Sequence, residues 1–401
     1  MKTRKPVFLL PLLGCLLMVL SACFTPYTGE EVTVTIGVDN SENGRTLLPL
    51  NINGQPTETL SYEVILSSSS RTKQYSFEPG VPLTVKVFQG KYDITVRAMG
   101  ASTMYSATAG FPSTILRALG EWSGDIRAGN KMIPVTMYSA TEVTTWEQLD
   151  AALGGISLPR KEIIILKGGG PLTLGSVLII TRPIEIRAES PVTIYSSGSG
   201  IFQINGINGK LTLKGPLTLN GNAGSTVITV GGTDGELYIY DGVTITNGFS
   251  GTNAGGVIVN TGCKFYMYGG TIAGNITGST GVGGGVLVMS GSEFTMSGGT
   301  ITGNTAYNGG GVSASGLFTM LGNAEIYGNN AAMYGGGVYV TPPGIIRLAG
   351  GAIYGQGHPL ANFASGGGHA LTVLSGASAT FGDGTIIPGG GNWNDTIYGK
   401  P

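Results

Sequence analysis

The sequence of 401 residues has little charge and little cysteine. Charged residues make up 11% of it, against about 25% in ordinary globular proteins, and 22 lysines and arginines nearly balance 23 aspartates and glutamates. Without a basic excess the chain lacks the footprint of a nucleic-acid-binding protein, so we expect no nucleic-acid partner. Its three cysteines are Cys15, Cys23 and Cys263, and no metal-ligand spacing surrounds Cys263. We expect neither a metal site nor another cofactor.

The N-terminal apolar run is too short to cross a membrane. Residues 6–20 are uncharged and follow three basic residues among the first five, whereas a membrane-spanning helix needs about 20 apolar residues. A positive segment followed by an apolar run of this length is typical of a secretory signal peptide. The next residues, Leu20-Ser21-Ala22-Cys23, resemble the lipobox of bacterial lipoproteins.

This resemblance implies that residues 1–22 are removed and that Cys23 carries lipid, with 23–29 as a short tether. The membrane would then be a partner through the lipid, and the protein would belong to the cell envelope. Phe24, the second mature residue, resembles the outer-membrane sorting signal of enterobacterial lipoproteins. An ordinary signal peptide followed by a chance cysteine is the alternative. Only Cys263 would remain unmodified, which excludes an internal disulfide and leaves stability to packing.

Residues 30–140 show the period-two alternation of half-buried strands, as in Val32-Val34-Ile36-Val38 and Leu83-Val85-Val87. About seven short strands over about 110 residues predict a small β-sandwich, immunoglobulin-like or transthyretin-like. The segment Gly-Lys-Tyr-Asp-Ile-Thr-Val at 90–96 resembles a strand common in such bacterial modules. This resemblance implies a spacer or a binding module, and we assign no chemistry to the domain.

Glycine is concentrated in the rest of the chain, where 56 of the 70 glycines lie in residues 168–401. Residues 145–153 predict one short amphipathic helix ended by two glycines, and we assign 141–160 to a capping helix and lead-in. Beyond it, three markers recur every 25 to 29 residues. They are strand-closing isoleucines (Ile245, Ile272, Ile301, Ile326, Ile353), Gly-Gly-Val triplets (255–257, 284–286, 310–312, 336–338) and asparagines (Asn222, Asn247, Asn275, Asn304, Asn329).

A period of about 26 residues with three short strands and no helix fits one coil of a right-handed parallel β-helix, whereas propeller blades are longer. We therefore expect an all-β fold: a small sandwich, then eight or nine coils over 161–390, with 391–401 as a C-terminal cap. The five asparagines are expected to form a ladder at one corner, each side-chain amide bonding to the next coil.

The segment Ile301-x-Gly303-Asn304-x-Ala306, followed by Gly310-Gly311-Val312, resembles the repeats of polymorphic outer membrane proteins and of pectin-lyase-like repeat proteins. The resemblance covers about 160–390 and implies the fold. It implies no single activity, because lyases, hydrolases and adhesins share this architecture.

Catalytic side chains are hard to find in the repeats. Polysaccharide hydrolases need two carboxylic acids at one bond, and lyases need a calcium cage and a base. The seven acids beyond residue 200 are scattered in repeat register, with Glu293 and Glu325 on different columns. His358 lacks an acidic or basic motif beside it. We therefore name no catalytic residue and expect a non-enzymatic protein, with a polysaccharide lyase or hydrolase as the alternative.

Outward-facing tyrosines are the informative feature of the repeats. Alternation places Tyr238, Tyr240, Tyr266 and Tyr268 on the outer surface of adjacent coils. An aromatic patch beside polar groups suits stacking on sugar rings or a protein contact, so we expect an adhesin-like or envelope binding module with a glycan or protein ligand. The competing interpretation is that tyrosine simply favours strands and stacks on itself, which would leave the rod a structural spacer.

Overall fold

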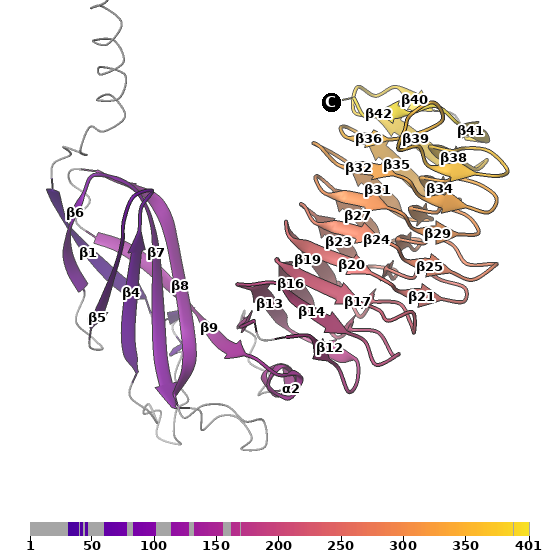
Figure 1. Ribbon diagram of the computed structural model, residues 1–401. Coiled ribbons are helices and arrows are strands. Elements are labelled where there is room, and N and C mark those ends of the chain that lie inside the picture. Colours follow the sequence, from indigo (N-terminus) through magenta and orange to yellow (C-terminus); the bar gives the residue numbers. More distant parts are fainter. Residues whose placement is uncertain are drawn as a thin grey trace, which may run out of the picture. The chain divides into compact units, whose positions relative to one another are not determined.

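The computed structural model describes residues 31–39, 41–42, 45–46, 60–77, 83–101, 114–127, 132–154, 162–168, 170–387 and 389–400. The expected signal peptide, Cys23 and the tether lie outside these residues. The described chain is mostly β with one short helix, and it divides into two compact units (Figure 1). Unit 1 draws on residues up to 41, 61–97 and 120–137, and unit 2 on 42–60, 98–119 and 138 onward.

Unit 1 is built mainly from antiparallel strands. Its strands are β1 (Glu31–Asp39), β4 (Ser61–Ser67), β5 (Thr72–Phe77), β6 (Leu83–Phe88) and parts of β7 (Gly90–Ala101), β8 (Thr114–Ile126) and β9 (Met132–Val143), while β2 (Ser41–Glu42) and β3 (Arg45–Thr46) form a separate pair. Strand β1 runs antiparallel to β6 and parallel to β9, and β4 runs antiparallel to β5. Alternate residues such as Val34, Val64 and Val96 are fully buried, which is the pattern that the sequence predicted for this region.

Unit 2 is a parallel β-helix of about eight turns, so the predicted fold class is confirmed. Sheet 1 contains β10 (Glu162–Leu166), β13 (Pro183–Ala188), β16 (Lys210–Lys214), β19 (Glu236–Ile239), β23 (Lys264–Met267), β27 (Glu293–Met296), β31 (Leu317–Met320), β35 (Ile345–Leu348) and β39 (Ser378–Phe381). Sheet 2 contains β11 (Leu172–Thr173), β14 (Val192–Tyr195), β17 (Leu217–Asn220), β20 (Val243–Thr246), β24 (Thr271–Ala273), β28 (Thr300–Thr302), β32 (Glu325–Tyr327) and β36 (Ala352–Ile353).

A third sheet runs through every turn, and a fourth sheet adds a short strand to the later turns. Sheet 3 contains β12 (Leu178–Ile180), β15 (Phe202–Ile204), β18 (Ile228–Val230), β22 (Val257–Val259), β26 (Val286–Val288), β30 (Val312–Ala314), β34 (Val338–Val340) and β38 (Leu371–Val373). Sheet 4 contains the two-residue strands β21 (Phe249–Ser250), β25 (Ile276–Thr277), β29 (Thr305–Ala306), β33 (Asn330–Ala331) and β37 (Phe363–Ala364). The prediction of three strands per turn was therefore wrong for the later turns. A strand of two residues is too short to show the alternation of apolar and polar residues by which a strand is recognised in a sequence.

Stacked identical side chains fill the interior of the β-helix. Register pairs Phe265 with Phe294 and Phe294 with Phe318, and their rings stack at centroid distances of 4.5 and 4.9 Å. All three rings are fully buried, as is Cys263. Because each turn repeats the previous one at the strand spacing of about 4.8 Å, one residue choice per column sets both the register and the packing.

Both ends of the β-helix core are covered. At the first turn lies α2 (Trp146–Gly154), whose Leu149 and Leu153 belong to the core. At the last turn, β40 (Ile386–Ile387), β41 (Gly391–Trp393) and β42 (Ile397–Tyr398) pair antiparallel with β39, β38 and β36. Trp146 and Trp393 pack against the core from opposite ends of its sequence. These antiparallel strands cover the backbone edges of the last parallel strands, which would otherwise be left unpaired.

Candidate functional site

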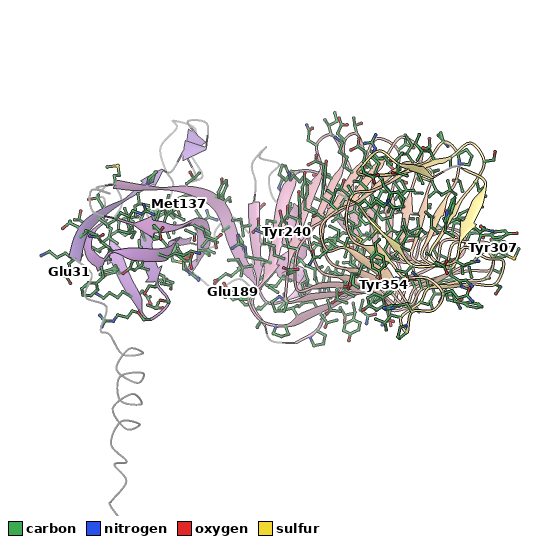
Figure 2. All side chains as sticks on the ribbon, turned by 90° about the horizontal axis from the view of Figure 1, so that it is seen from above. Glu31, Met137, Glu189, Tyr240, Tyr307 and Tyr354 are labelled. Carbon is green, nitrogen blue, oxygen red and sulfur yellow. The ribbon has the colours of Figure 1, made fainter. Side chains whose placement is uncertain are left out.

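The four predicted tyrosines lie side by side on the outer face of sheet 1. Strand β16 pairs with β19 and β19 with β23, so that Thr212, Tyr238 and Tyr266 follow one another along one column. Tyr240 and Tyr268 directly follow β19 and β23 and occupy the next outward column; Figure 2 labels Tyr240. The inward neighbours Ile239 and Met267 are fully buried, which fixes the tyrosines outward by alternation.

These tyrosines form a stack in which the rings face one another. The ring centroids of Tyr238 and Tyr266 are 4.8 Å apart, with an angle of 22° between ring planes. Those of Tyr240 and Tyr268 are 5.0 Å apart, at 28°. Since these distances match the spacing of neighbouring strands, each ring covers a face of the ring on the next turn. We call the four residues the tyrosine stack.

Two lysines of the preceding turn cover the near side of the tyrosine stack. Lys210 Nζ lies 4.1 Å from the centre of the Tyr238 ring, and Lys214 Nζ lies 5.4 Å from that of Tyr240. Such cation–π contacts contribute roughly 0.5–1 kcal/mol each at exposed sites. The near faces of Tyr238 and Tyr240 are therefore occupied by cations.

Carboxylates hold both lysines in place. Lys210 Nζ is 3.3 Å from a carboxylate oxygen of Glu236, to which the Tyr238 hydroxyl donates a hydrogen bond of 2.8 Å. Lys214 Nζ is 3.3 Å from Glu185, a carboxylate that is 1% exposed and also bonded by Arg187. Glu185 is thus a buried charge with cationic partners, the condition under which a buried carboxylate is tolerated.

The far side of the tyrosine stack is open. Strand β27 pairs with β23 and places Thr295 beside Tyr266, and Ser297 follows β27 at the position that corresponds to Tyr268. Neither side chain is large enough to cover a phenol ring. Tyr268 is 46% exposed, and we call its uncovered side, together with that of Tyr266, the open face. An exposed aromatic face above small hydroxyl side chains can accept a flat or puckered ring.

Burial raises the pKa of the Tyr238 phenol above its ordinary value, and the hydrogen bond to Glu236 and its charge raise it further. Burial is also the main cause that raises the pKa of Tyr240 and Tyr266. These three phenols are therefore neutral at physiological pH and can donate or accept hydrogen bonds.

The structure contains an asparagine ladder, but its residues are not all those that the sequence predicted. Asn275 Nδ2 donates to Asn304 Oδ1, Asn304 Nδ2 to Asn329 Oδ1, and Asn329 Nδ2 to Asn362 Oδ1, each at 2.9 Å. Asn362 was missed because a longer loop separates it by 33 residues from Asn329. The sequence feature that could have identified Asn362 is its position directly before β37, the last two-residue strand of sheet 4.

Asn222 and Asn247 stand outside this ladder, which corrects the expectation of five stacked asparagines. Both side chains are exposed, and their backbones have φ values of 52° and 54°. They serve the left-handed bends that asparagine tolerates. At the second of these corners, the amide of Gly248 donates to Asn275 Oδ1 at 2.9 Å.

The two acids Glu293 and Glu325 lie on different sheets of the repeats. Glu293 begins β27 of sheet 1 and Glu325 begins β32 of sheet 2. Tyr354 donates a hydrogen bond of 2.8 Å to Glu325, and the His358 ring lies 4.2 Å from the Tyr354 ring. His358 Nδ1 accepts a hydrogen bond of 3.1 Å from the backbone amide of Leu360. The ring of His358 therefore stabilises the loop that carries it.

Within the ranges described above, no three His, Cys, Asp or Glu side chains gather as a metal site would require. The same residues include no helix with the length and apolar character needed to cross a membrane.

Comparison with known proteins gives no match, since neither a protein-family model, nor a curated protein, nor a solved structure is significantly similar to this chain. The functional argument therefore depends on the geometry of the tyrosine stack and its surroundings.

Proposed function

We propose that the protein is a non-enzymatic, adhesin-like binding module that holds a sugar ring of a glycan against the open face of Tyr266 and Tyr268. The single observation that carries this proposal is the asymmetry of the stack. Cations and a second pair of rings cover one side, whereas small hydroxyl side chains leave the other side exposed at Tyr268.

Polar groups around the open face fit a saccharide better than a purely apolar ligand. Thr295 and Ser297 present hydroxyls beside the rings, and Lys264 and Glu293 occupy opposite register positions of β23 and β27 on the neighbouring outward column. A sugar offers an apolar ring face for the tyrosines and a rim of hydroxyls for these groups. Aromatic contact area with a few placed polar groups is the usual composition of such sites.

The anchoring of the module is part of the same proposal. Residues 1–22 would be a signal peptide, Cys23 would carry lipid, and the protein would face its ligand from the cell envelope, with the outer membrane as its destination. The lipobox resemblance of residues 20–23 supports this. Replacing Cys23 with alanine and following acyl labelling in cells tests it: loss of the label is expected, and retained label contradicts it.

The binding proposal is tested with the full chain and its Tyr268→Ala variant on a panel of polysaccharides, recording both retention and product release. We expect retention without product release, weakened at least tenfold in the variant. The matched control is Tyr307→Ala, which removes a tyrosine that is 37% exposed outside sheet 1. Equal retention by both variants would refute the open face as the site, and product release would make the protein a carbohydrate-active enzyme.

A further inference from the structure

A carboxylate and three tyrosines lie together on the outer face of sheet 2, at its C-terminal end. Glu325 and Tyr327 belong to β32, and Tyr354 directly follows β36 on the next turn. Strand β42 pairs antiparallel with β36 and places Tyr398 opposite Ala352, which in turn lies opposite Glu325. Glu325, Tyr327 and Tyr354 are half-buried and Tyr398 is 61% exposed, so a ligand can reach all four from solvent.

The rings of Tyr327 and Tyr354 form a corner beside the carboxylate, which we call the tyrosine corner. Their centroids are 6.0 Å apart and their planes meet at 80°. The Tyr354 hydroxyl, on a residue that Figure 2 labels, donates a hydrogen bond of 2.8 Å to Oε1 of Glu325. The His358 ring packs 4.2 Å from that of Tyr354 and supports it. Among the described residues, Oε2 of Glu325 has no hydrogen-bond or ion-pair partner.

The same tyrosine–carboxylate pairing occurs in the tyrosine stack, where it holds a lysine. There Tyr238 donates a hydrogen bond of 2.8 Å to Glu236, and Lys210 Nζ lies 4.1 Å from the ring centre and 3.3 Å from the carboxylate. One ammonium group thus receives both a π face and a charge-assisted hydrogen bond. In the part of the chain that the structure describes, no lysine or arginine lies over Tyr354 or pairs with Glu325.

A half-buried carboxylate without a cationic partner favours a bound cation. The hydrogen bond to Glu325, burial and the charge of that carboxylate together raise the pKa of Tyr354 to about 12, so the phenol stays neutral and the charge of Glu325 stays unbalanced. An organic cation suits the surroundings better than a metal ion, because the rings of Tyr327 and Tyr398 offer apolar surface to carbon chains. A primary ammonium fits best, since it donates N–H groups to the carboxylate.

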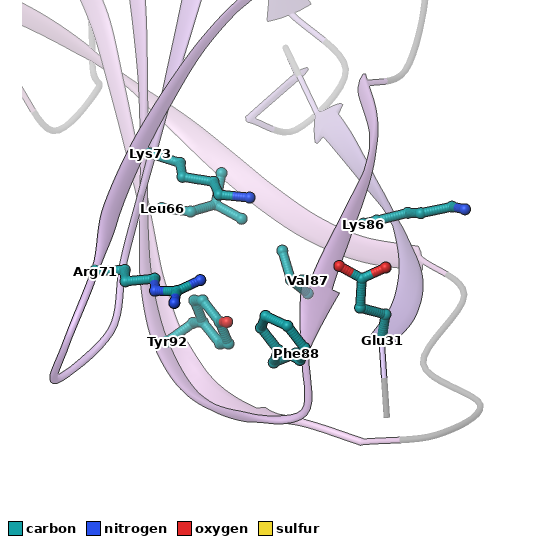
Figure 3. Close-up of a pocket in the computed structure, with 8 residues that line it drawn as sticks. All are labelled: Glu31, Leu66, Arg71, Lys73, Lys86, Val87, Phe88 and Tyr92. Atoms are coloured by element: carbon teal, nitrogen blue, oxygen red, sulfur yellow. The ribbon is translucent and has the colours of Figure 1, made fainter. Parts of the chain in front are cut away.

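We propose that Glu325 and the tyrosine corner bind the primary ammonium group of an organic amine, with its alkyl chain against Tyr398. This chemistry is shared by free alkylamines and by the lysine side chains of peptides. The site lies on sheet 2, whereas the tyrosine stack lies on sheet 1, so either proposal can fail without the other. The small cavity of unit 1 has no part in it, because its volume of about 20 Å³ has room for about one water molecule (Figure 3).

The test is saturation-transfer NMR titration of the full chain at pH 7 with n-hexylammonium, with neutral n-hexanol and with the N-acetyl, N-methylamide derivative of lysine. We expect hexylammonium to bind roughly tenfold more tightly than hexanol, with the difference shrinking as added salt screens the charge. Tighter binding of the lysine derivative than of hexylammonium would identify peptide lysines as the source of the ammonium, and the reverse order free amines. Equal affinity of hexylammonium and hexanol, or binding of no probe, would overturn the proposal.

Variants separate an ammonium site from a carboxylate that only fixes Tyr354. Glu325→Gln keeps an acceptor for the Tyr354 hydroxyl but removes the charge, and should weaken hexylammonium binding roughly tenfold. Tyr327→Leu should weaken it about threefold. The matched control is Asp234→Asn, which removes the same charge from an exposed turn whose φ of 55° suits asparagine, and it should bind like the unaltered chain.

If Glu325→Gln binds hexylammonium as well as the unaltered chain does, the inference fails. Near-ultraviolet circular dichroism of each variant verifies that the β-helix remains folded.

Discussion

Lys210 lies over the ring of Tyr238 and, with the same ammonium group, pairs with the carboxylate to which that tyrosine donates its hydroxyl hydrogen bond. Tyr238 is thereby held on both sides, by Lys210 on one face and by Tyr266 on the other. It is a support of the stack and not a surface for ligand. In the proposed binding mode, Tyr266 and Tyr268, where the stack ends, contact the ligand ring.

Extending the stack by one residue should abolish glycan binding. In Ser297→Tyr, the new ring would follow Tyr240 and Tyr268 on the next turn and cover the open face. We expect at least a tenfold loss of retention on the polysaccharides that the unaltered chain binds. Stability should be unchanged or should rise by roughly 0.5–1 kcal/mol, as stacked aromatic pairs contribute.

The control for this substitution is Thr380→Tyr, which adds an outward tyrosine to β39 at the far end of the same sheet. It should leave retention unchanged. Retained binding by Ser297→Tyr would show that the ligand contacts ring edges and hydroxyl groups and not the open face.

Removing a side chain from the asparagine ladder should destabilise the β-helix. Asn304 is fully buried, accepts from the backbone and side chain of Asn275, and donates to Ile272 O. Asn304→Ala leaves these groups buried without partners, each at a cost of about 1–3 kcal/mol. We expect the variant to lose roughly 3 kcal/mol, measured as a lower urea midpoint by circular dichroism.

Asn247→Gly is the matched control, since this asparagine is exposed and its positive φ suits glycine. Its midpoint should change little. If both variants unfold at the same urea concentration, the ladder contributes no stability of its own.

The sequence predicted the parts of the fold that repeat, and the structure shows why the rest escaped. The recurring phenylalanines predict an inward column, because the same residue type occurs at equivalent positions of successive turns (Phe265, Phe294 and Phe318). Sheet 4 and Asn362 are set by loop lengths that vary from turn to turn, so spacing alone misplaces them. For the candidate site, alternation predicted the outward tyrosines. It could not show that their rings face one another, because this depends on side-chain rotation and on Lys210.

The Tyr354 phenol should ionise at an unusually high pH. Its hydrogen bond to Glu325, followed by burial and the charge of that carboxylate, raises its pKa to about 12. Glu325→Gln removes the negative charge, so the pKa should fall toward the ordinary value of about 10. Ultraviolet titration of phenolate absorbance, as the difference between the two proteins, measures the shift, and Tyr354→Phe identifies the transition. Identical titration curves would contradict the assignment.

The same shift has a consequence for stability. Because the folded pKa lies above the unfolded one, the contribution of Tyr354 is fully present below about pH 10 and is lost as the pH rises through about 12. The urea midpoint of the unaltered chain should therefore fall more steeply over this window than that of Tyr354→Phe. A steeper fall in the variant would reverse the sign and refute the linkage.

Deleting residues 391–401 should turn the chain into a self-associating protein. Strands β41 and β42 pair antiparallel with β38 and β36, and Trp393 packs against the core. Without them, the last turn exposes unpaired backbone groups beside apolar side chains, which is the usual cause of edge-to-edge association. Sedimentation velocity should show concentration-dependent oligomers. Tyr398→Ala, which removes a side chain that is 61% exposed from β42, should sediment like the unaltered chain. A monomeric deletion variant would mean that the edges of β36 and β38 are protected by their own side chains, and that the reversed strands serve another purpose.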